Sequence, residues 1–468
     1  MPAHLEFALS FTRSKARRDA PDDPMRLLVI GDFSAKPAAQ RPPLASRPTH
    51  RVDADNLDQV LKRLAPRLGR LTGELVFEQL DDFHPDRLYA RLDLFQALRQ
   101  ARASPGAGHD DLLGSLLGKP AAAPPGPEAA PAPAPATGID ALIRSIVAPH
   151  IVRDTSAQTS HYLAAIDAAT TEQMRALLHE PAFQALESAW RGVQWLVSRL
   201  ELDEDLQLHL FDVSKEELVA DFVAAQGDLS RSGLALAVCG PATDTPDDPV
   251  WSLLVGLFGF GPGADDLGLL GAMGVVAAQA GGPLVAAAAP ALYGCGSVTD
   301  LTDPMLWTPL ATDAARQWSA LRTSAVAPWI GLVAPRLLLR LPYGKATDPI
   351  EQFAFEEQAG APVHETLLWG AGSLALAQLA GQAFTEGGWE LAPDHVTELA
   401  DLPAYTFRRN EEAELQPCAE AWLGERACQA LLKRGLMPLL SHHQRAAVRL
   451  MRMQSIADPP CALAGGRY

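Results

Sequence analysis

The stretch from Met25 to Phe33 reads MRLLVIGDF, and it decides how the first part of the chain is interpreted. Its opening residues form a short apolar run, which Gly31-Asp32 then interrupts. An apolar run of this length that ends in turn residues is typical of a strand buried on both faces. The sequence therefore predicts a buried strand over residues 25–30 that leads directly into a turn.

Downstream of this strand, helical and extended patterns alternate. Apolar residues recur at helical spacing over residues 57–64, after Asn56, which we expect to be an Asx N-cap. The segment GELVFEQL at 73–80 has the pattern of a strand, and an amphipathic helix is expected over 85–102. Residues 1–103 are therefore predicted to form a small α+β unit.

Upstream of Met25, the segment LEFALSF at residues 5–11 alternates apolar and polar residues well enough for a further strand. The remainder of the first twenty-odd residues is charged and contains proline, so the pattern predicts no other element there.

A compositional change separates this unit from the rest of the chain. Residues 119–136 read KPAAAPPGPEAAPAPAPA, which favours extended polyproline geometry and cannot form a packed core. We therefore expect three parts, namely a small domain at 1–103, a Pro/Ala-rich linker at 104–137 and a larger domain at 138–468.

The larger part begins with predicted helices at 139–147 and 157–170 and then alternates between strands and helices. Ser214 and Glu217 have the spacing of a capping box and predict a helix start. Alternation of this kind predicts an α/β domain. Buried strands are expected at residues 205–213, 233–238, 284–288 and 329–333.

Charge and composition exclude several classes of function. The 468 residues include 39 Lys and Arg against 56 Asp and Glu, a net charge of −17. The excess is uneven, because residues 1–103 carry a net charge of +3 and the remainder −20. An acidic chain repels polyanions, so we expect neither nucleic acid nor an anionic membrane as a partner.

The cysteines and the apolar segments point to a cytoplasmic protein. The five cysteines are widely spaced without a CxxC pair, which is typical of a reducing compartment, and the N-terminus lacks the apolar core of a signal peptide. The charge-free run at 269–289 contains Gly281-Gly282-Pro283. We interpret it as a buried helix, a turn and a buried strand rather than a membrane span.

Motifs of catalysis are missing from the sequence. It contains no phosphate-binding GxxxxGK[ST] loop, no HExxH and no GxSxG. Adjacent His442 and His443 point in different directions on a helix and are a poor metal site. Paired carboxylates are more simply explained as residues at helix starts, where they satisfy free N–H groups. We therefore expect no catalytic, cofactor-binding or metal-binding residue. Such carboxylate pairs occur at Asp53/Asp55, Asp81/Asp82, Asp247/Asp248, Asp265/Asp266 and Glu356/Glu357.

Several stretches in both halves resemble the sheath proteins of the bacterial type VI secretion system. Residues 5–103 resemble the small subunit, TssB, and residues 138–443 resemble the large subunit, TssC. The resemblance to TssB rests on MRLLVIGDF at 25–33, VDADNL at 52–57 and LVFEQLDDF at 75–83 with Pro85. The resemblance to TssC rests on LHEPAFQALESAWRG at 178–192, PRLLLRLPYG at 335–344, PIE at 349–351, and the pairs Trp369-Gly370, Gly388-Trp389, Leu402-Pro403 and Thr406-Phe407.

This resemblance implies a sheath-protomer-like fold, in which two halves pack as a TssB/TssC-type heterodimer within one chain. It also implies a structural, non-enzymatic protein that associates with itself and with sheath, baseplate or tube proteins. In the family, extended strands link neighbouring protomers. We expect the segment with Leu5, Phe7, Leu9 and Phe11 to be the exchanged strand, and Asp81, Asp82 and Phe83 to form a helix-capping junction between the halves.

The sequence also departs from the family pattern. Val238-Cys239-Gly240-Pro241 and Trp369-Gly370-Ala371 replace a usual Gly-Asp-Tyr-like turn and Trp-Gly-Asn, and the sequence ends at Tyr468, where large subunits continue. These departures favour a cap, a baseplate adaptor or an assembly regulator over bulk sheath. The alternatives are a soluble binding module for effector or tube proteins and, less favoured, an enzyme that reuses the α/β region.

Overall fold

The computed structural model describes residues 23–70, 73–103, 158–240, 250–390, 392, 394–410, 412–443 and 445–465. The predicted strand at 5–11, the predicted linker and the predicted helix at 139–147 lie outside these described residues.

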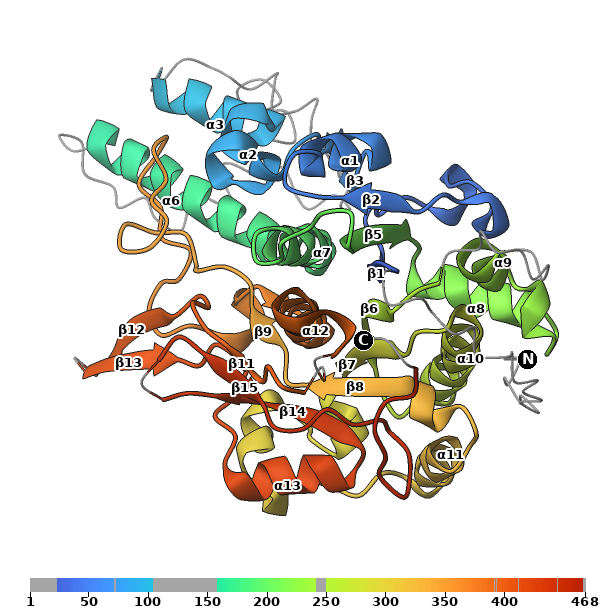
Figure 1. Ribbon diagram of the computed structural model, residues 1–468. Helices are drawn as coiled ribbons and strands as arrows, with labels where there is room; N and C mark the ends of the chain where they lie inside the picture. Colours follow the sequence, from blue (N-terminus) through green and yellow to red (C-terminus); the bar gives the residue numbers. More distant parts are fainter. Residues whose placement is uncertain are drawn as a thin grey trace, which may run out of the picture.

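A nine-stranded mixed sheet runs through the whole described structure (Figure 1). Its six central strands, from β14 to β5, are parallel, and antiparallel strands complete it at both edges. In spatial order the strands are β11 (Glu398–Leu399), β15 (Val448–Leu450), β14 (Leu436–Ser441), β8 (Ile330–Ala334), β7 (Leu284–Ala288), β6 (Leu253–Phe260), β1 (Met25–Gly31), β5 (Leu206–Asp212) and β2 (His50–Val52).

Helices cover both faces of this sheet, as expected for parallel strands, which are rarely exposed. One hydrophobic cluster joins the first face to helices α7 and α12 and to helices α1 to α3 of the small half. A second cluster joins the opposite face to helices α8 to α11 and α13. The helices are α1 (Leu57–Leu64), α2 (Pro85–Arg91), α3 (Asp93–Ala103), α6 (Gln158–Leu178), α7 (Pro181–Val197), α8 (Lys215–Ala224), α9 (Gly233–Cys239), α10 (Ala264–Ala280), α11 (Thr312–Arg322), α12 (Ser373–Gly387) and α13 (Glu425–Lys433).

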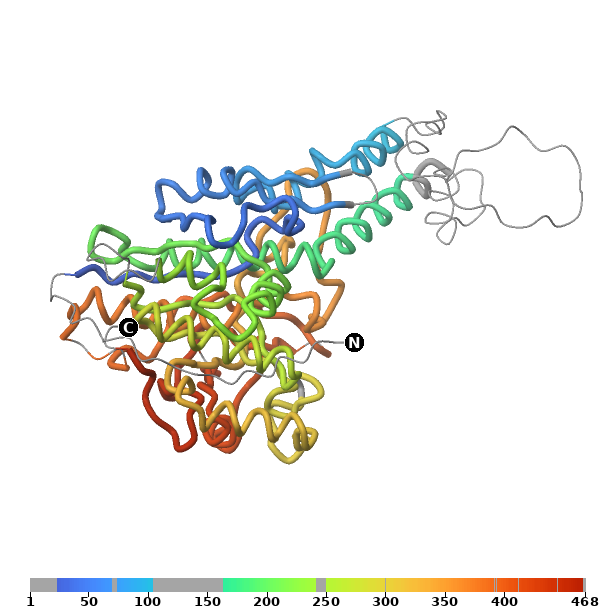
Figure 2. Tube along the Cα trace, turned by 90° about the vertical axis from the view of Figure 1, so that its right-hand side faces the viewer, coloured from blue at the N-terminus to red at the C-terminus, as the bar shows by residue number. Residues whose placement is uncertain are grey.

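Three two-stranded sheets lie beside the main sheet, and helices α3 and α6 run alongside one another at one end of the molecule (Figure 2). The ion pair between Arg102 and Asp167 joins these two helices. The small sheets pair β3 (Arg67–Arg70) with β4 (Gly73–Val76), β9 (Leu337–Leu338) with β10 (Trp369–Gly370), and β12 (Tyr405–Arg409) with β13 (Glu412–Gln416).

Several sequence-based expectations are confirmed. The fold is mixed α/β, and strands form at the predicted positions 25–30, 205–213, 284–288 and 329–333, with ends shifted by a residue or so. The capping box of Ser214 and Glu217 opens α8. The apolar run at 269–289 is a buried helix, a turn and a buried strand. Among the helices of the described residues, none has the length and apolar composition that a bilayer crossing needs.

Other expectations are wrong. The segment 233–238 is helix α9 rather than a strand, because the Ser232 side chain accepts a hydrogen bond from the backbone N–H of Ala235 and starts a helix. The extended segment at 73–80 pairs only over β4, and an extended Leu92 divides the expected helix at 85–102 into α2 and α3. Strands β6 and β14 were not predicted.

A smaller correction concerns the start of α1. Asn56 occupies the N-cap position, but its side chain makes no capping hydrogen bond. The carboxylate of Asp53 instead accepts hydrogen bonds from the backbone N–H groups of Asp55 and Asn56. The side chain that closes the turn before α1 is therefore that of Asp53 and not that of the predicted cap, Asn56.

Candidate functional site

Strand β1 lies in the middle of the main sheet, although the strands on both sides of it come from the larger half of the chain. It pairs in parallel with β5 from Met25↔Leu206 to Gly31↔Asp212, and with β6 from Leu27↔Leu253 to Ile30↔Gly256. The small half is therefore part of the sheet of the large half, rather than a separate α+β unit packed against it.

The side chains of β1 contribute to both hydrophobic cores. Successive residues of a strand point to opposite faces, so a strand without polar positions suits a site covered on both sides. Leu27 and Val29 join the cluster beneath α7 and α12, whereas Leu28 and Ile30 join the cluster beneath α10. All four side chains are fully buried.

The turn after β1 is fixed by a carboxylate of the large half. Asp212, at the end of β5, accepts hydrogen bonds from the backbone N–H groups of Phe33 and Ser34 at 2.8 and 2.9 Å. It also accepts one from the Ser34 hydroxyl at 2.7 Å. The buried turn thus obtains its hydrogen-bond acceptor from the other half of the chain.

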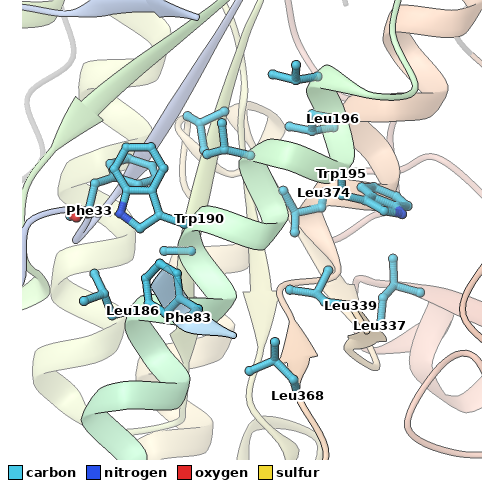
Figure 3. Close-up of a cluster of buried hydrophobic side chains, with 14 of the residues drawn as sticks. Phe33, Phe83, Leu186, Trp190, Trp195, Leu196, Leu337, Leu339, Leu368 and Leu374 are labelled. Atoms are coloured by element: carbon cyan, nitrogen blue, oxygen red, sulfur yellow. Dashed lines mark hydrogen bonds between the residues drawn. The ribbon is translucent and has the colours of Figure 1, made fainter. Parts of the chain in front are cut away.

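Helix α7 lies between the turn and the rest of the large half. The Trp190 indole N–H donates to the Phe33 carbonyl oxygen at 2.8 Å, and the two rings meet edge to face at 5.5 Å. Figure 3 shows Phe33 and Phe83 on one side of α7, and Leu374 of α12 with other leucines on the opposite side. One helix therefore packs against both halves.

Charged residues from both halves meet close to this turn. We call Asp32, Arg41, Arg47, Asp212 and Glu217 the ionic cluster. Arg41 places its guanidinium 2.8 Å from Glu217 and 2.7 Å from Asp32. Arg47 lies 2.9 Å from Glu217 and donates to the backbone carbonyl of Asp212 at 2.6 Å.

Burial and pairing have opposite effects on the carboxylates of this cluster. Burial raises the pKa of Asp32, and the nearby Arg41 only partly opposes the change. Burial would also raise the pKa of Glu217, but hydrogen bonds from Arg47 and from the Ser214 backbone, with the charges of both arginines, hold it below its ordinary value. Glu217 is therefore an ionised carboxylate that depends on arginines of the other half.

A second contact joins the halves through residues 342–357, which we call the strap. The carboxylate of Asp86, in the first turn of α2, accepts hydrogen bonds from the backbone N–H groups of Glu351 and Gln352 at 3.1 and 3.0 Å. His84 meets the Tyr343 ring edge at 5.0 Å, and Tyr89 packs on Phe353 with centroids 4.6 Å apart.

A buried network anchors this strap to α7. The Arg340 guanidinium lies 2.8 Å from both Glu187 and Glu357, and these carboxylate side chains are at most 1% exposed. Burial disfavours all of these charges, but the pairing dominates. It raises the pKa of Arg340, and despite burial the charge of Arg340, with hydrogen bonds from Arg340 and from the Tyr343 backbone N–H, lowers the pKa of Glu357 to about 2. Within residues 336–343 of the neighbouring segment, only β9 forms a paired strand.

The structure separates the three predicted junction residues. Phe83 is fully buried, stacks on Phe77 with centroids 4.1 Å apart and meets Phe183 of α7 edge to face. Asp82 accepts hydrogen bonds from the backbone N–H groups of Glu78 and Gln79 within the small half. Asp81 is largely exposed. Leu5, Phe7, Leu9 and Phe11 lie outside the described residues.

Asp247 and Asp248 lie outside the described residues, and the other paired carboxylates do not converge on a common site. Asp265 and Asp266 lie in the first turn of α10, as expected. Glu356 and Glu357 are not at a helix start, and Glu357 instead belongs to the buried network. Within the described part of the chain, no group of three or more His, Cys, Asp or Glu side chains is arranged to hold a metal ion.

Sequence reasoning missed the arginines of the ionic cluster that join the halves. Arg41 and Arg47 lie in the proline-rich stretch 36–50, where the local sequence predicts no helix or strand, and their partners in the large half are far away in the sequence. One signal was present, because Glu217 had been identified as a capping-box residue, and it does cap α8. Its pairing with the arginines became visible only in three dimensions.

Comparisons with known proteins agree with this two-part organisation. The sequence profile of VipB, described as EvpB/VC_A0108, tail sheath N-terminal domain, matches residues 160–457. The profile described as Type VI secretion system, VipA, VC_A0107 or Hcp2, matches residues 14–122.

Two curated relatives come from Pseudomonas aeruginosa. The type VI secretion system sheath protein TssC1 is 32% identical over 315 residues, which cover 66% of this chain and 63% of the relative. The sheath protein TssB1 is 31% identical over 90 residues, which cover 17% of this chain and 52% of the relative. The chain thus spans somewhat more than half the length of each relative that it matches.

Proposed function

Because the chain belongs to the VipB family of tail sheath proteins and carries a VipA-like domain ahead of it, we propose that it is a sheath-type protomer with both of its halves in a single chain. It is a TssB/TssC-like protein of the type VI secretion sheath, a structural and non-enzymatic family. The observation that carries the proposal is the position of β1 between β5 and β6. We propose domains at 1–103 and 138–468, joined by a linker at 104–137.

The energetics of the shared sheet support a fixed one-to-one pairing. Removing β1 would expose fully buried side chains on both faces and leave backbone groups of β5 and β6 without partners. A covalent linker also raises the effective concentration of one half near the other to the millimolar range. Both effects favour a protomer that is assembled as soon as the chain folds.

The partners follow from the same proposal. Sheath, baseplate or tube proteins of a type VI secretion system and further copies of this chain would be its neighbours, in the cytoplasm. Leu5, Phe7, Leu9 and Phe11 are proposed as the strand that reaches a neighbouring protomer, because an added strand can extend the edge of another sheet. Asp81, Asp82 and Phe83 are proposed as the junction between the halves, to which Phe83 contributes its contact with Phe183.

A narrower role as a cap, baseplate adaptor or assembly regulator is a second proposal. It is favoured by the edges of the main sheet, where β2 has three residues and β11 has two. Short edge strands are poor templates for adding a further strand. Within the described residues, the main sheet is thus poorly suited to growth from copy to copy.

Negative-stain imaging of the full-length protein, with its mass measured in parallel, tests these proposals. Long hollow tubes would support bulk sheath and contradict the narrower role. Monomers or small closed rings that bind a partner sheath, baseplate or tube would support the cap or adaptor. If the protein neither polymerises nor binds any of these components, the proposed function is wrong.

A further inference from the structure

The ionic cluster is divided between the two halves in a way that leaves neither half balanced. The small half supplies the cations Arg41 and Arg47 together with Asp32, and the large half supplies the anions Asp212 and Glu217. Asp32 neutralises part of the charge within the small half, and the carboxylates of the large half neutralise the rest of the charge on the two arginines.

These groups are withdrawn from water in the paired state. The side chains of Arg41 and Arg47 are 2% and 5% exposed, and those of Asp212 and Glu217 are 8% and 9% exposed. A buried ion pair adds little net stability, but a buried charge that loses its partner is strongly destabilising. The cluster thus penalises a wrong partner far more than it rewards the correct one.

The fixed positions of the two arginines determine where a partner must place its carboxylates. The Arg41 Nε–H donates to the Lys36 carbonyl at 2.8 Å, and Arg47 donates to the Pro42 carbonyl at 2.7 Å. Both guanidinium groups are therefore held by their own proline-rich loop and aimed in fixed directions. A partner must present one carboxylate at the end of β5 and a second at the third residue of the following helix.

The other contacts between the halves discriminate less. The ladder of β1 uses backbone groups that every strand possesses, and apart from Arg26, which donates to the Gln207 side chain, its side chains are apolar. Such contacts stabilise pairing with many related large halves to a similar degree. A buried charge without its partner, in contrast, disfavours pairing with a large half that lacks the matching carboxylate.

We propose that Arg41 and Arg47 select the large half that this small half accepts, through Glu217 and Asp212. The accepted partner is a large half that carries both acids, either in the same chain or in a second copy. A sheath-type large half without the acid at the Glu217 position is rejected. This selection concerns pairing alone and holds whether or not the protomer joins a polymer.

Exchange between two full-length variants tests the selection. The first variant, Arg47→Gln, leaves Glu217 with one arginine, and the second, Glu217→Gln, leaves Arg47 buried without its carboxylate. A swapped dimer of the two would contain one Arg47–Glu217 pair and one pair of neutral glutamines, at which Arg41 keeps Asp32 and Asp212, so neither interface buries Arg47 or Glu217 without the other. The chain between residues 103 and 158 is long enough for exchange, at roughly 3 Å per extended residue.

The two variants, with different affinity tags, are mixed in denaturant, refolded together and purified through both tags in succession. We expect the mixed species at least tenfold above the amount from differently tagged wild-type chains. The matched control uses Arg102→Gln and Asp167→Asn, which remove an ion pair between the halves whose side chains are 55% and 50% exposed. This control pair is expected to exchange no more than wild type.

A second measurement uses one chain that carries both Arg47→Gln and Glu217→Gln. Its urea midpoint is expected to lie nearer to wild type than the sum of the two single losses predicts, because Arg47 and Glu217 are removed together and Arg41 keeps Asp32 and Asp212. Additive losses, or a mixed species no more abundant than in the control, would overturn the proposed selection. Polymer formation is not a readout, so failure here is distinct from failure of the sheath function.

Discussion

Trp190 of the large half connects the halves through one buried hydrogen bond, from its indole N–H to the Phe33 carbonyl oxygen. Trp190→Phe keeps an aromatic ring but leaves the Phe33 carbonyl without its donor. We expect a loss of about 1–3 kcal/mol of unfolding free energy, the usual cost of a buried group that loses its partner. Trp195→Phe is the matched control, since Trp195 lies on the same helix and is 7% exposed. Equal losses for both in chemical unfolding would contradict this role.

Glu357 should give the protein an acid-sensitive stability. Its pKa is lowered from 4.5 to about 2, so its contribution is complete above about pH 4.5 and is lost as the pH falls towards 2. At about 1.4 kcal/mol per pKa unit, the change corresponds to roughly 3 kcal/mol. Glu357→Gln should destabilise the protein at pH 7 and flatten the pH dependence between 4.5 and 2. The neighbouring, exposed Glu356 provides the control Glu356→Gln, which should retain the acid-dependent loss seen in urea unfolding.

At the scale of single elements, helix α9 depends on its N-cap. The segment is as apolar as a buried strand, and only Ser232 at its start indicates a helix. Ser232→Ala should cost about 1 kcal/mol, because the Ala235 N–H loses its acceptor. Ser230→Ala, at an exposed serine nearby, should have little effect. A similar loss for both variants in thermal unfolding would argue against the capping role.

Strand β1 should couple the two cores, because its side chains enter both. Leu28→Ala is expected to cost about 2–5 kcal/mol through lost burial and the remaining cavity. Hydrogen exchange should then accelerate in both halves, including α3 and β14. Leu306→Ala is the control, at a leucine that is 57% exposed, and it should change stability by less than about 0.5 kcal/mol. Faster exchange confined to the small half would show that the cores are independent.

At the scale of the whole molecule, the halves should stay together without a covalent connection. A protease site inserted within 119–136 and cut after folding should leave one complex of unchanged mass in size-exclusion chromatography. The shared sheet, the ionic cluster and the strap all remain intact after the cut. Separation of the halves at micromolar concentration would contradict the packing of β1 within the large sheet.

The sequence predicted strands that are almost entirely apolar, such as β1, β7 and β8, because burial on both faces requires apolar side chains at successive positions. It missed β6, where glycines dilute the apolar pattern, and it assigned α9 wrongly because a short buried helix and a buried strand have the same composition. It also missed Arg41, Arg47 and Arg340, since nothing near them in the sequence shows their partners.

The sequence by itself thus determined the α/β class, the two-part organisation and the resemblance to sheath proteins, since local periodicity, composition and short motifs carry that information. Only the tertiary structure decided that β1 enters the middle of the other half's sheet and that Arg41 and Arg47 meet Asp212 and Glu217. The physical reason is that strand order and ion pairing join residues far apart along the chain. They are chosen by the burial and charge balance of the whole fold, which no local pattern records.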